Sequence, residues 1–198
     1  MLGKLFNKGT AEENFWNWFV ENSRQIASIP DGNVEIGKEL LKKIKSYNKN
    51  LTYEIVKGAS GFEFVISCDG EREQIPFANI LANTAPEIEG WKVVLFRRKK
   101  SINKKITHQG LEMAPDDILV EYTLYKDEIH LRLYIRNYYQ GDDRYRALAD
   151  KFLERTLGEF DVMTKVGAIE YVADKSDMSD VEVISLAQLR EVVQDSLR

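Results

Sequence analysis

One histidine and three carboxylates in the middle of the sequence could carry out acid–base or metal chemistry. Asp116, Asp117 and Glu121 precede His130, and imidazole and carboxylate groups together serve as general bases or bind zinc. Such a site requires the four side chains to converge in one cleft, which their spacing alone does not predict. The two aspartates could equally cap the turn in which they lie. A hydrolase-type enzyme using these groups is one hypothesis, although we expect no metal and no cofactor.

A run of basic residues with no acid among them is a second candidate. It consists of Arg97, Arg98, Lys99, Lys100, Lys104 and Lys105. Such a run can contact phosphates and gives a salt-dependent affinity for nucleic acid. However, no aromatic residue within the run could stack on a base, and the whole chain has a formal net charge of -4. The sequence therefore predicts a flexible charged loop, with a nucleic-acid accessory role as an alternative.

A third candidate is the polar side of a predicted β-hairpin over residues 118–136, where apolar and polar residues alternate with a period of two. A turn at Lys126-Asp127 places Ile118 opposite Ile135, and Glu121 opposite Arg132 on the other face. The polar face then carries Glu121, Thr123, Tyr125, His130, Arg132, Tyr134 and Arg136. These groups either bind a polar ligand or peptide, or form an ordinary solvated surface.

The composition indicates a folded protein. The 198 residues are 43% hydrophobic and 30% charged, which suffices for one core or for two small subdomains that share a sheet. No stretch approaches the ~20 apolar residues of a membrane span, and the first nine residues are too polar for a signal peptide. We therefore expect a cytoplasmic protein. The single Cys68 excludes an internal disulfide, and its place in an apolar run indicates a core residue.

Helical and strand patterns divide the chain into two similar halves. Thr10 and Glu13 form a capping-box pattern before the first helix, and Asn33 can cap the second. The elements expected in the first half are helices over 11–28 and 34–49, strands over 51–57 and 62–68, a helix over 76–86 and a strand over 91–97. After the 118–136 hairpin we expect a helix over 144–157, a strand over 166–172 and a helix over 186–197.

This order predicts an α+β fold in which helices cover one face of a mainly antiparallel sheet. Both halves read β-β-α-β, which suggests a pseudo-duplication, although one long sheet whose units arose separately would give the same order. We expect a single domain over 1–198. Its predicted parts are a flexible terminus over 1–9, a first half over 10–97, a charged connector over 98–117 and a second half over 118–198.

Two further features bear on partners. The residues from 159 onward are predominantly acidic, and an acidic surface can orient a protein partner or drive self-association. Strands at the edge of a sheet, expected at 91–97 or 166–172, could pair between two copies and give a dimer.

Three short stretches, FWNWF, ISCDG at 66–70 and LGEFD at 157–161, resemble a family of uncharacterised bacterial proteins. The resemblance covers most of the chain and implies a bacterial cytoplasmic origin. It implies no activity and no catalytic residues.

The leading hypothesis is a non-catalytic cytoplasmic module that presents either the polar hairpin face or the acidic C-terminal surface to a protein partner. It depends on strong core-forming patterns combined with the absence of any standard catalytic motif from the sequence.

Overall fold

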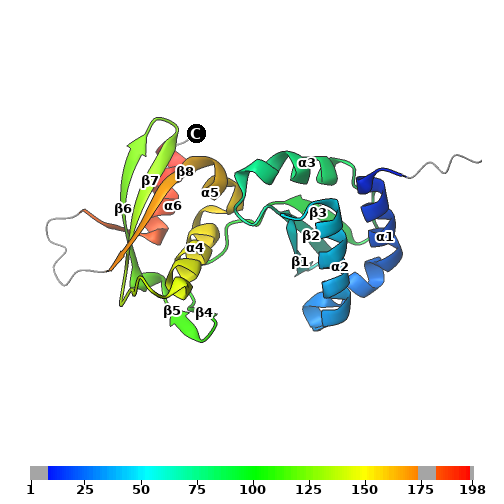
Figure 1. The fold of residues 1–198 in the computed structure, drawn as a ribbon, viewed down its shortest axis with the longest axis horizontal. Coiled ribbons are helices and arrows are strands. Elements are labelled where there is room, and N and C mark those ends of the chain that lie inside the picture. Colours follow the sequence, from blue (N-terminus) through cyan, green and yellow to red (C-terminus); the bar gives the residue numbers. More distant parts are fainter. Residues whose placement is uncertain (1–8, 174–181, 197–198) are drawn as a thin grey trace, which may run out of the picture. The chain divides into compact units, whose positions relative to one another are not determined.

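The computed structural model describes residues 9–173 and 182–196, and the chain divides into two compact units, residues 1–96 and 97–198. The first unit begins with two helices and continues with a small mixed sheet (Figure 1). Its elements are α1 (Ala11–Ile26), η1 (Ile29–Asp31), α2 (Val34–Tyr47), β1 (Thr52–Gly58), β2 (Gly61–Ser67), η2 (Arg72–Gln74), α3 (Ile75–Asn83) and β3 (Trp91–Leu95).

Local signals account for where these helices begin. The Thr10 side chain accepts from the backbone of Glu13, and Glu13 accepts in return from the backbone of Thr10, which completes the predicted capping box. Asn33 caps α2, as predicted, by accepting from the Ile36 N–H. Pro76 lies in the first turn of α3, where no intrahelical N–H is needed.

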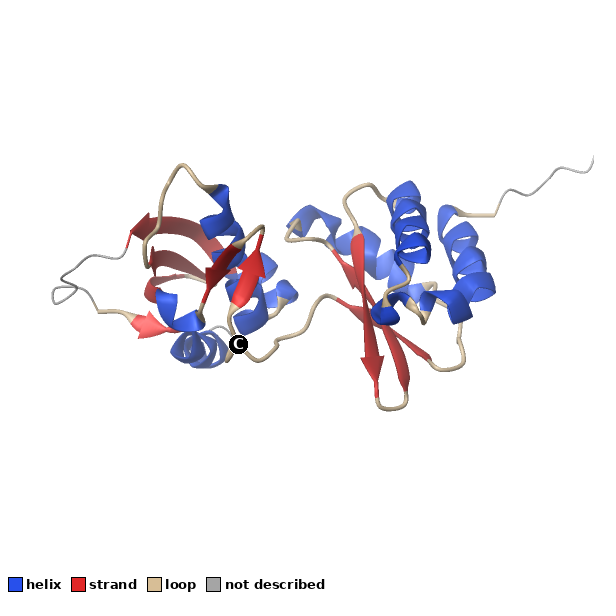
Figure 2. Ribbon diagram, turned by 90° about the horizontal axis from the view of Figure 1, so that it is seen from below, coloured by secondary structure: helices blue, strands red, loops and turns tan. Residues whose placement is uncertain are grey.

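In the first unit the helices lie against one face of the sheet (Figure 2). Aromatic side chains make up much of the core of this unit. Phe19 of α1 is fully buried, and its ring lies 4.8 Å from that of Phe64 on β2. The Trp16 indole N–H donates to the Leu81 carbonyl at 2.9 Å and ties α1 to α3. Cys68 is fully buried, as predicted.

The second unit has a four-stranded sheet with the order β8-β7-β6-β9, and its helices lie on one side of that sheet (Figure 1). Its elements are β4 (Ile106–His108), β5 (Leu111–Met113), η3 (Pro115–Asp117), β6 (Ile118–Tyr125), β7 (Glu128–Ile135), α4 (Asp143–Leu157), α5 (Glu159–Lys165), β8 (Val166–Ala173), β9 (Ile184–Ser185) and α6 (Leu186–Ser196).

The β6–β7 hairpin has the predicted register along its whole length. Ile118 lies opposite Ile135 and Glu121 lies opposite Arg132. Its apolar side packs against α4 and α6 in one buried cluster. The helices do not cover the tip of the hairpin, however, and Tyr122 and Leu124 are therefore 36% and 46% exposed. The alternation of apolar residues along 118–136 therefore continues beyond the part of the hairpin that is buried.

The two units share one strand topology. In each unit an antiparallel hairpin, β1–β2 or β6–β7, is followed by a helical segment. The next strand, β3 or β8, then pairs in parallel with the second strand of the hairpin. The α+β class and the repeated β-β-α-β order are thus confirmed, while the strands form separate sheets instead of one long one.

The division between the units falls between Phe96 and Arg97. It lies one residue before the end of the predicted first half, 10–97, and the residues predicted as a connector, 98–117, belong to the second unit and include β4, β5 and η3. These strands have three residues each, which is too short for an alternating pattern to be recognised. That the chain acts as a single domain stays a prediction.

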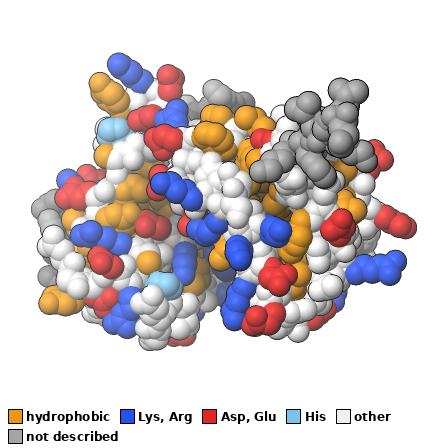
Figure 3. Space-filling model, turned by 45° about the vertical axis from the view of Figure 1, so that its right-hand side comes forward, with side chains coloured by type: hydrophobic (Ala, Val, Ile, Leu, Met, Phe, Trp, Pro, Cys, Tyr) orange, Lys and Arg blue, Asp and Glu red, His pale blue; other side chains and the backbone are white. Residues whose placement is uncertain are grey.

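On the face that Figure 3 shows, acidic and basic side chains are interspersed. Among the described residues, no helix is long and apolar enough to cross a membrane.

Candidate functional site

The polar side of the β6–β7 hairpin, together with its neighbour β8, forms a sheet face opposite the helices. The period of two along each strand directs Val120 and Leu133 into the core and Glu121 and Arg132 to the other side. In the parallel β7–β8 pair, Glu170 lies beside Arg132 and joins the same face. We call this surface, defined by the outward-facing residues 121–136 and 168–172, the open face.

An ion-pair row crosses the open face from strand to strand. Arg132 Nε donates to Glu170 Oε2 at 2.7 Å, and Arg132 Nη1 donates to Glu121 Oε2 at 3.1 Å. The hydrogen bond to Glu170 is the main reason that the pKa of Arg132 lies above its ordinary value. The side chains of this row are 35% to 58% exposed, so the row is accessible and has one negative charge in excess.

Tyr134 supports this row from below instead of projecting from it. Its hydroxyl donates to Glu121 Oε2 at 2.8 Å, and only 2% of the residue is exposed. Burial raises the pKa of Tyr134, and the hydrogen bond to Glu121 raises it further, so the phenol stays a donor. In register, Tyr134 lies between Leu119 of β6 and Val172 of β8. The Tyr134 ring, which was predicted to be among the ligand-binding groups, is therefore packed within the sheet.

A shallow groove of about 260 Å³ runs beside the row, with Thr123, His130 and Glu170 in its lining. Tyr125 and His130 have ring centroids 5.7 Å apart at the tip. His130 Nε2 lies 3.9 Å from Glu128 Oε2. Gly167 makes room for the imidazole, because a Cβ there would lie 2.6 Å from His130 Cδ2.

Arg136, the last residue predicted for this face, is used at the base of the hairpin. Its Nη1 donates to Asp117 Oδ1 at 2.7 Å. The other Asp117 carboxylate oxygen accepts from the Ala114 N–H, also at 2.7 Å. These two bonds fasten η3 to the end of β7, so Arg136 and Asp117 have a structural role and do not line the groove.

The residues of the hydrolase hypothesis do not converge. Asp117 precedes β6, whereas His130 lies opposite Thr123, six residues further along that strand, which is about 20 Å in an extended chain. Glu121 lies between them and is bound to Arg132 and Tyr134. Within the described residues, no group of three or more His, Cys, Asp or Glu side chains could hold a metal ion.

At least three of the six residues of the basic run form ion pairs with acids of the second unit. Arg97 pairs with Glu154 at 3.1 Å, Lys99 with Asp161 at 3.2 Å and Lys105 with Glu112 at 2.7 Å. The segment is also attached through its backbone, since the Lys100 N–H donates to the Arg155 carbonyl at 2.8 Å. The run is thus bound to α4, α5 and β5, and it is not the free loop that the sequence suggests.

The acidic C-terminal residues are likewise used in part within the fold. Glu159 is 1% exposed, Asp161 lies within salt-bridge distance of Lys99 and Lys165, and Glu170 belongs to the ion-pair row. Asp174, Asp177 and Asp180, on which the prediction of an acidic surface also depended, lie outside the described residues.

One polar cluster was not found from the sequence. The Tyr171 hydroxyl of β8 donates to Asp150 of α4 at 2.5 Å, and Arg146 lies over the Tyr171 ring while donating to the Tyr138 hydroxyl. Burial raises the pKa of Asp150, and burial is also the first cause of the raised pKa of Tyr171. The spacing of Arg146 and Asp150 on one helix face was the available signal. The cluster joins α4 to β8.

No family model, curated protein or solved structure matches the chain.

Proposed function

We propose that the chain is a protein-binding module that docks a partner on the open face. The observation that carries this proposal is the exposed row Glu121–Arg132–Glu170 on the side of the sheet opposite the helices. A row of this kind combines donors and acceptors on neighbouring strands in fixed geometry, as recognition surfaces require. The buried Tyr134 hydroxyl holds Glu121 in place, so the row is preorganised.

The shape of the surface favours a macromolecular partner. At about 260 Å³ the groove is smaller than most pockets for small molecules, and it is shallow and continuous with the exposed residues Thr123 and Tyr125. Tyrosine and arginine are also the residue types that contribute most at protein interfaces. The excess negative charge of the row favours a partner with a basic residue at the point of contact.

Co-purification with matched variants tests this proposal. The amount of partner that co-purifies with the wild-type chain is compared with the amount that co-purifies with each of two variants. Arg132→Glu reverses the central charge, and Thr123→Arg fills the groove without removing the row. Arg24→Glu, an equal charge change at an exposed position of α1, is the control. We expect both open-face variants to lose the partner at least tenfold, whereas the control retains it. Equal recovery on all four chains would refute the proposal.

A second candidate, self-association, is favoured by the position of β8. This eight-residue strand forms an edge of its sheet and contains a single charged residue, Glu170. Its outer N–H and C=O groups can pair with another strand, and two copies related by a two-fold axis would satisfy each other. Sedimentation velocity at increasing concentration should then show a dimer, and Ala168→Lys should abolish it. The control Ala187→Lys lies on α6. A wild-type chain that stays monomeric at every concentration would refute self-association.

A further inference from the structure

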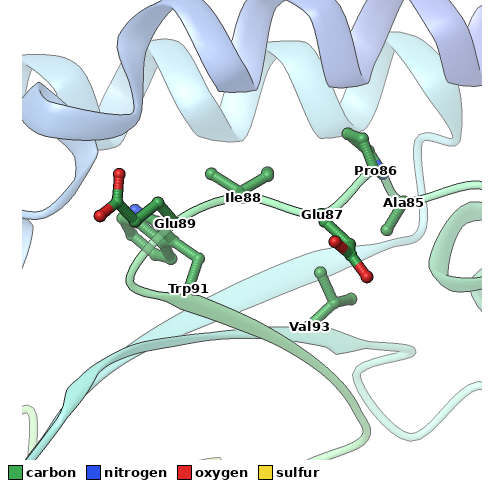
Figure 4. Close-up of a pocket in the computed structure, with 7 residues that line it drawn as sticks. All are labelled: Ala85, Pro86, Glu87, Ile88, Glu89, Trp91 and Val93. Carbon is green, nitrogen blue, oxygen red and sulfur yellow. The ribbon is translucent and has the colours of Figure 1, made fainter.

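The first unit contains a hollow of about 650 Å³ between β3 and the segment that leads into it, residues 85–90 (Figure 4). This volume lies in the range of sites that bind small molecules and side chains. The hollow is independent of the open face, which belongs to the second unit.

The floor of the hollow is apolar and firmly held. Trp91 and Val93 form it from β3, and the Trp91 ring packs against Phe19 and Phe62 with centroid distances of 5.1 and 5.2 Å. Because these contacts fix the indole, the floor exists before any ligand arrives.

The upper side of the hollow is also fixed by backbone bonds. The Trp91 N–H donates to the Ile88 carbonyl at 3.0 Å, and the Phe62 N–H donates to the Gly90 carbonyl at 2.8 Å. Gly61 permits this approach, since a Cβ there would lie 2.3 Å from the Gly90 carbonyl oxygen. The segment is therefore held in place over the strand.

Two carboxylates give the hollow its charge. Figure 4 shows the Glu87 side chain directed from the segment toward Val93, while Glu89 and Trp91 lie at the other end. Within the described residues, neither Glu87 nor Glu89 has a hydrogen bond or an ion pair, in contrast to Glu35, Glu112 and Glu121. Both carboxylates remain available to a cation.

We propose that this hollow binds a lysine or arginine side chain presented by a peptide segment of a partner protein. The aliphatic part of such a side chain would lie on Trp91 and Val93, and its charge would meet the Glu87 carboxylate, while Glu89 at the other end of the hollow adds to the negative potential. An uncharged side chain would make the same apolar contacts with the floor but would leave the two carboxylates without a counter-charge. The volume exceeds that of one side chain, so the residues next to the basic one also fit.

Titration of the ¹⁵N-labelled full chain with two blocked tripeptides tests this proposal. The peptides are acetyl-Ala-Lys-Ala-amide and its uncharged counterpart with norleucine in place of lysine. The Trp91 indole signal is identified by its loss in Trp91→Phe. We expect the lysine peptide to give saturable shifts of that signal and of the amides in 85–93. The norleucine peptide should bind at least fivefold more weakly.

The double variant Glu87→Gln/Glu89→Gln provides the decisive comparison. It keeps the shape of the hollow and should weaken the lysine peptide about fivefold, whereas Glu39→Gln, at an exposed position of α2, should leave its affinity unchanged. Equal affinity for the two peptides, an unchanged affinity in the double variant, or shifts that do not saturate would each overturn the proposal. The open-face experiments are unaffected by any of these results, because they concern other residues.

Discussion

Arg132 Nε donates to Glu170 Oε2 at 2.7 Å, and this contact joins the two parallel strands β7 and β8 on the open face. The same guanidinium reaches Glu121 on the other side at 3.1 Å. One cation thus serves two carboxylates from neighbouring strands while more than two fifths of its side chain stays exposed. A surface with this geometry offers a partner an ordered set of acceptors and donors.

Removal of the arginine should affect binding and not folding. Exposed ion pairs contribute little to stability because water screens them, so Arg132→Gln should leave the midpoint of urea unfolding unchanged. Equilibrium unfolding followed by circular dichroism measures this. A clear decrease of the midpoint would mean that the row serves the fold, and the open-face proposal would lose its main support.

Tyr134 should behave in the opposite way. Its ring is buried and its hydroxyl bonds to Glu121, so Tyr134→Phe should cost about 1 kcal/mol of unfolding free energy. Tyr134→Ala should cost about 3–5 kcal/mol because it leaves a cavity in the sheet. The control Tyr139→Ala, at a residue that is 69% exposed, should have little effect. Equal stability of the Tyr134 variants and the control would contradict the role given to this ring.

Glu159 should be essential to the attachment of the basic run. Its N–H donates to the Arg97 carbonyl at 2.9 Å, and its Oε2 accepts from the Arg97 N–H at 2.8 Å. Glu159→Ala leaves that N–H without its carboxylate acceptor and should cost about 1–3 kcal/mol in unfolding free energy. The exposed Glu191→Ala on α6 is the matched control. If the two alanine variants unfold at the same urea concentration, the attachment contributes nothing measurable.

The beginning of α4 should make stability depend on pH. Hydrogen bonds from the Arg144 side chain lower the pKa of Asp142 below its ordinary value. Its stabilising effect is therefore complete above that ordinary pKa and is lost as the pH falls through the lowered one. Asp142→Asn keeps the oxygen that caps the helix. The stability difference between wild type and this variant should be constant at neutral pH and shrink below about pH 4. A difference that grows on acidification would show the opposite sign.

The basic run should not retain nucleic acid. Arg97, Lys99 and Lys105 already pair with carboxylates. A filter-binding titration with a labelled DNA of about 20 nucleotides should therefore show no salt-dependent retention of the DNA. Retention that falls steeply with salt would restore the accessory role as the better hypothesis.

Local sequence pattern was sufficient for the central hairpin. Alternation over 118–136 and one turn at Lys126-Asp127 fixed the register, because a slip would break the pairing of Glu121 with Arg132. The capping of α1 and α2 followed from side chains within one helical turn. In both cases the interacting residues are close in sequence or are related by a simple period.

The missed features depend on distant residues. Arg97 meets Glu154 and Glu159, which are 57 and 62 positions away, and no pattern within 97–105 indicates them. The burial of Tyr134 depends on the parallel pairing with β8, and the exposure of Leu124 depends on where the helical cover ends. The helix expected over 144–157 does end before Gly158, but α5 begins directly after that glycine.

The most direct test of the open face is site-specific photo-crosslinking in the cells that express the chain. A photoreactive phenylalanine analogue replaces Thr123 on the open face or, as a control, Glu191 on α6. We predict a crosslinked product of discrete mass from position 123 that disappears when Arg132→Glu is added, and none from position 191. Products of equal yield from both positions, or a product at 123 that persists with Arg132→Glu, would contradict the proposal that this face binds a partner.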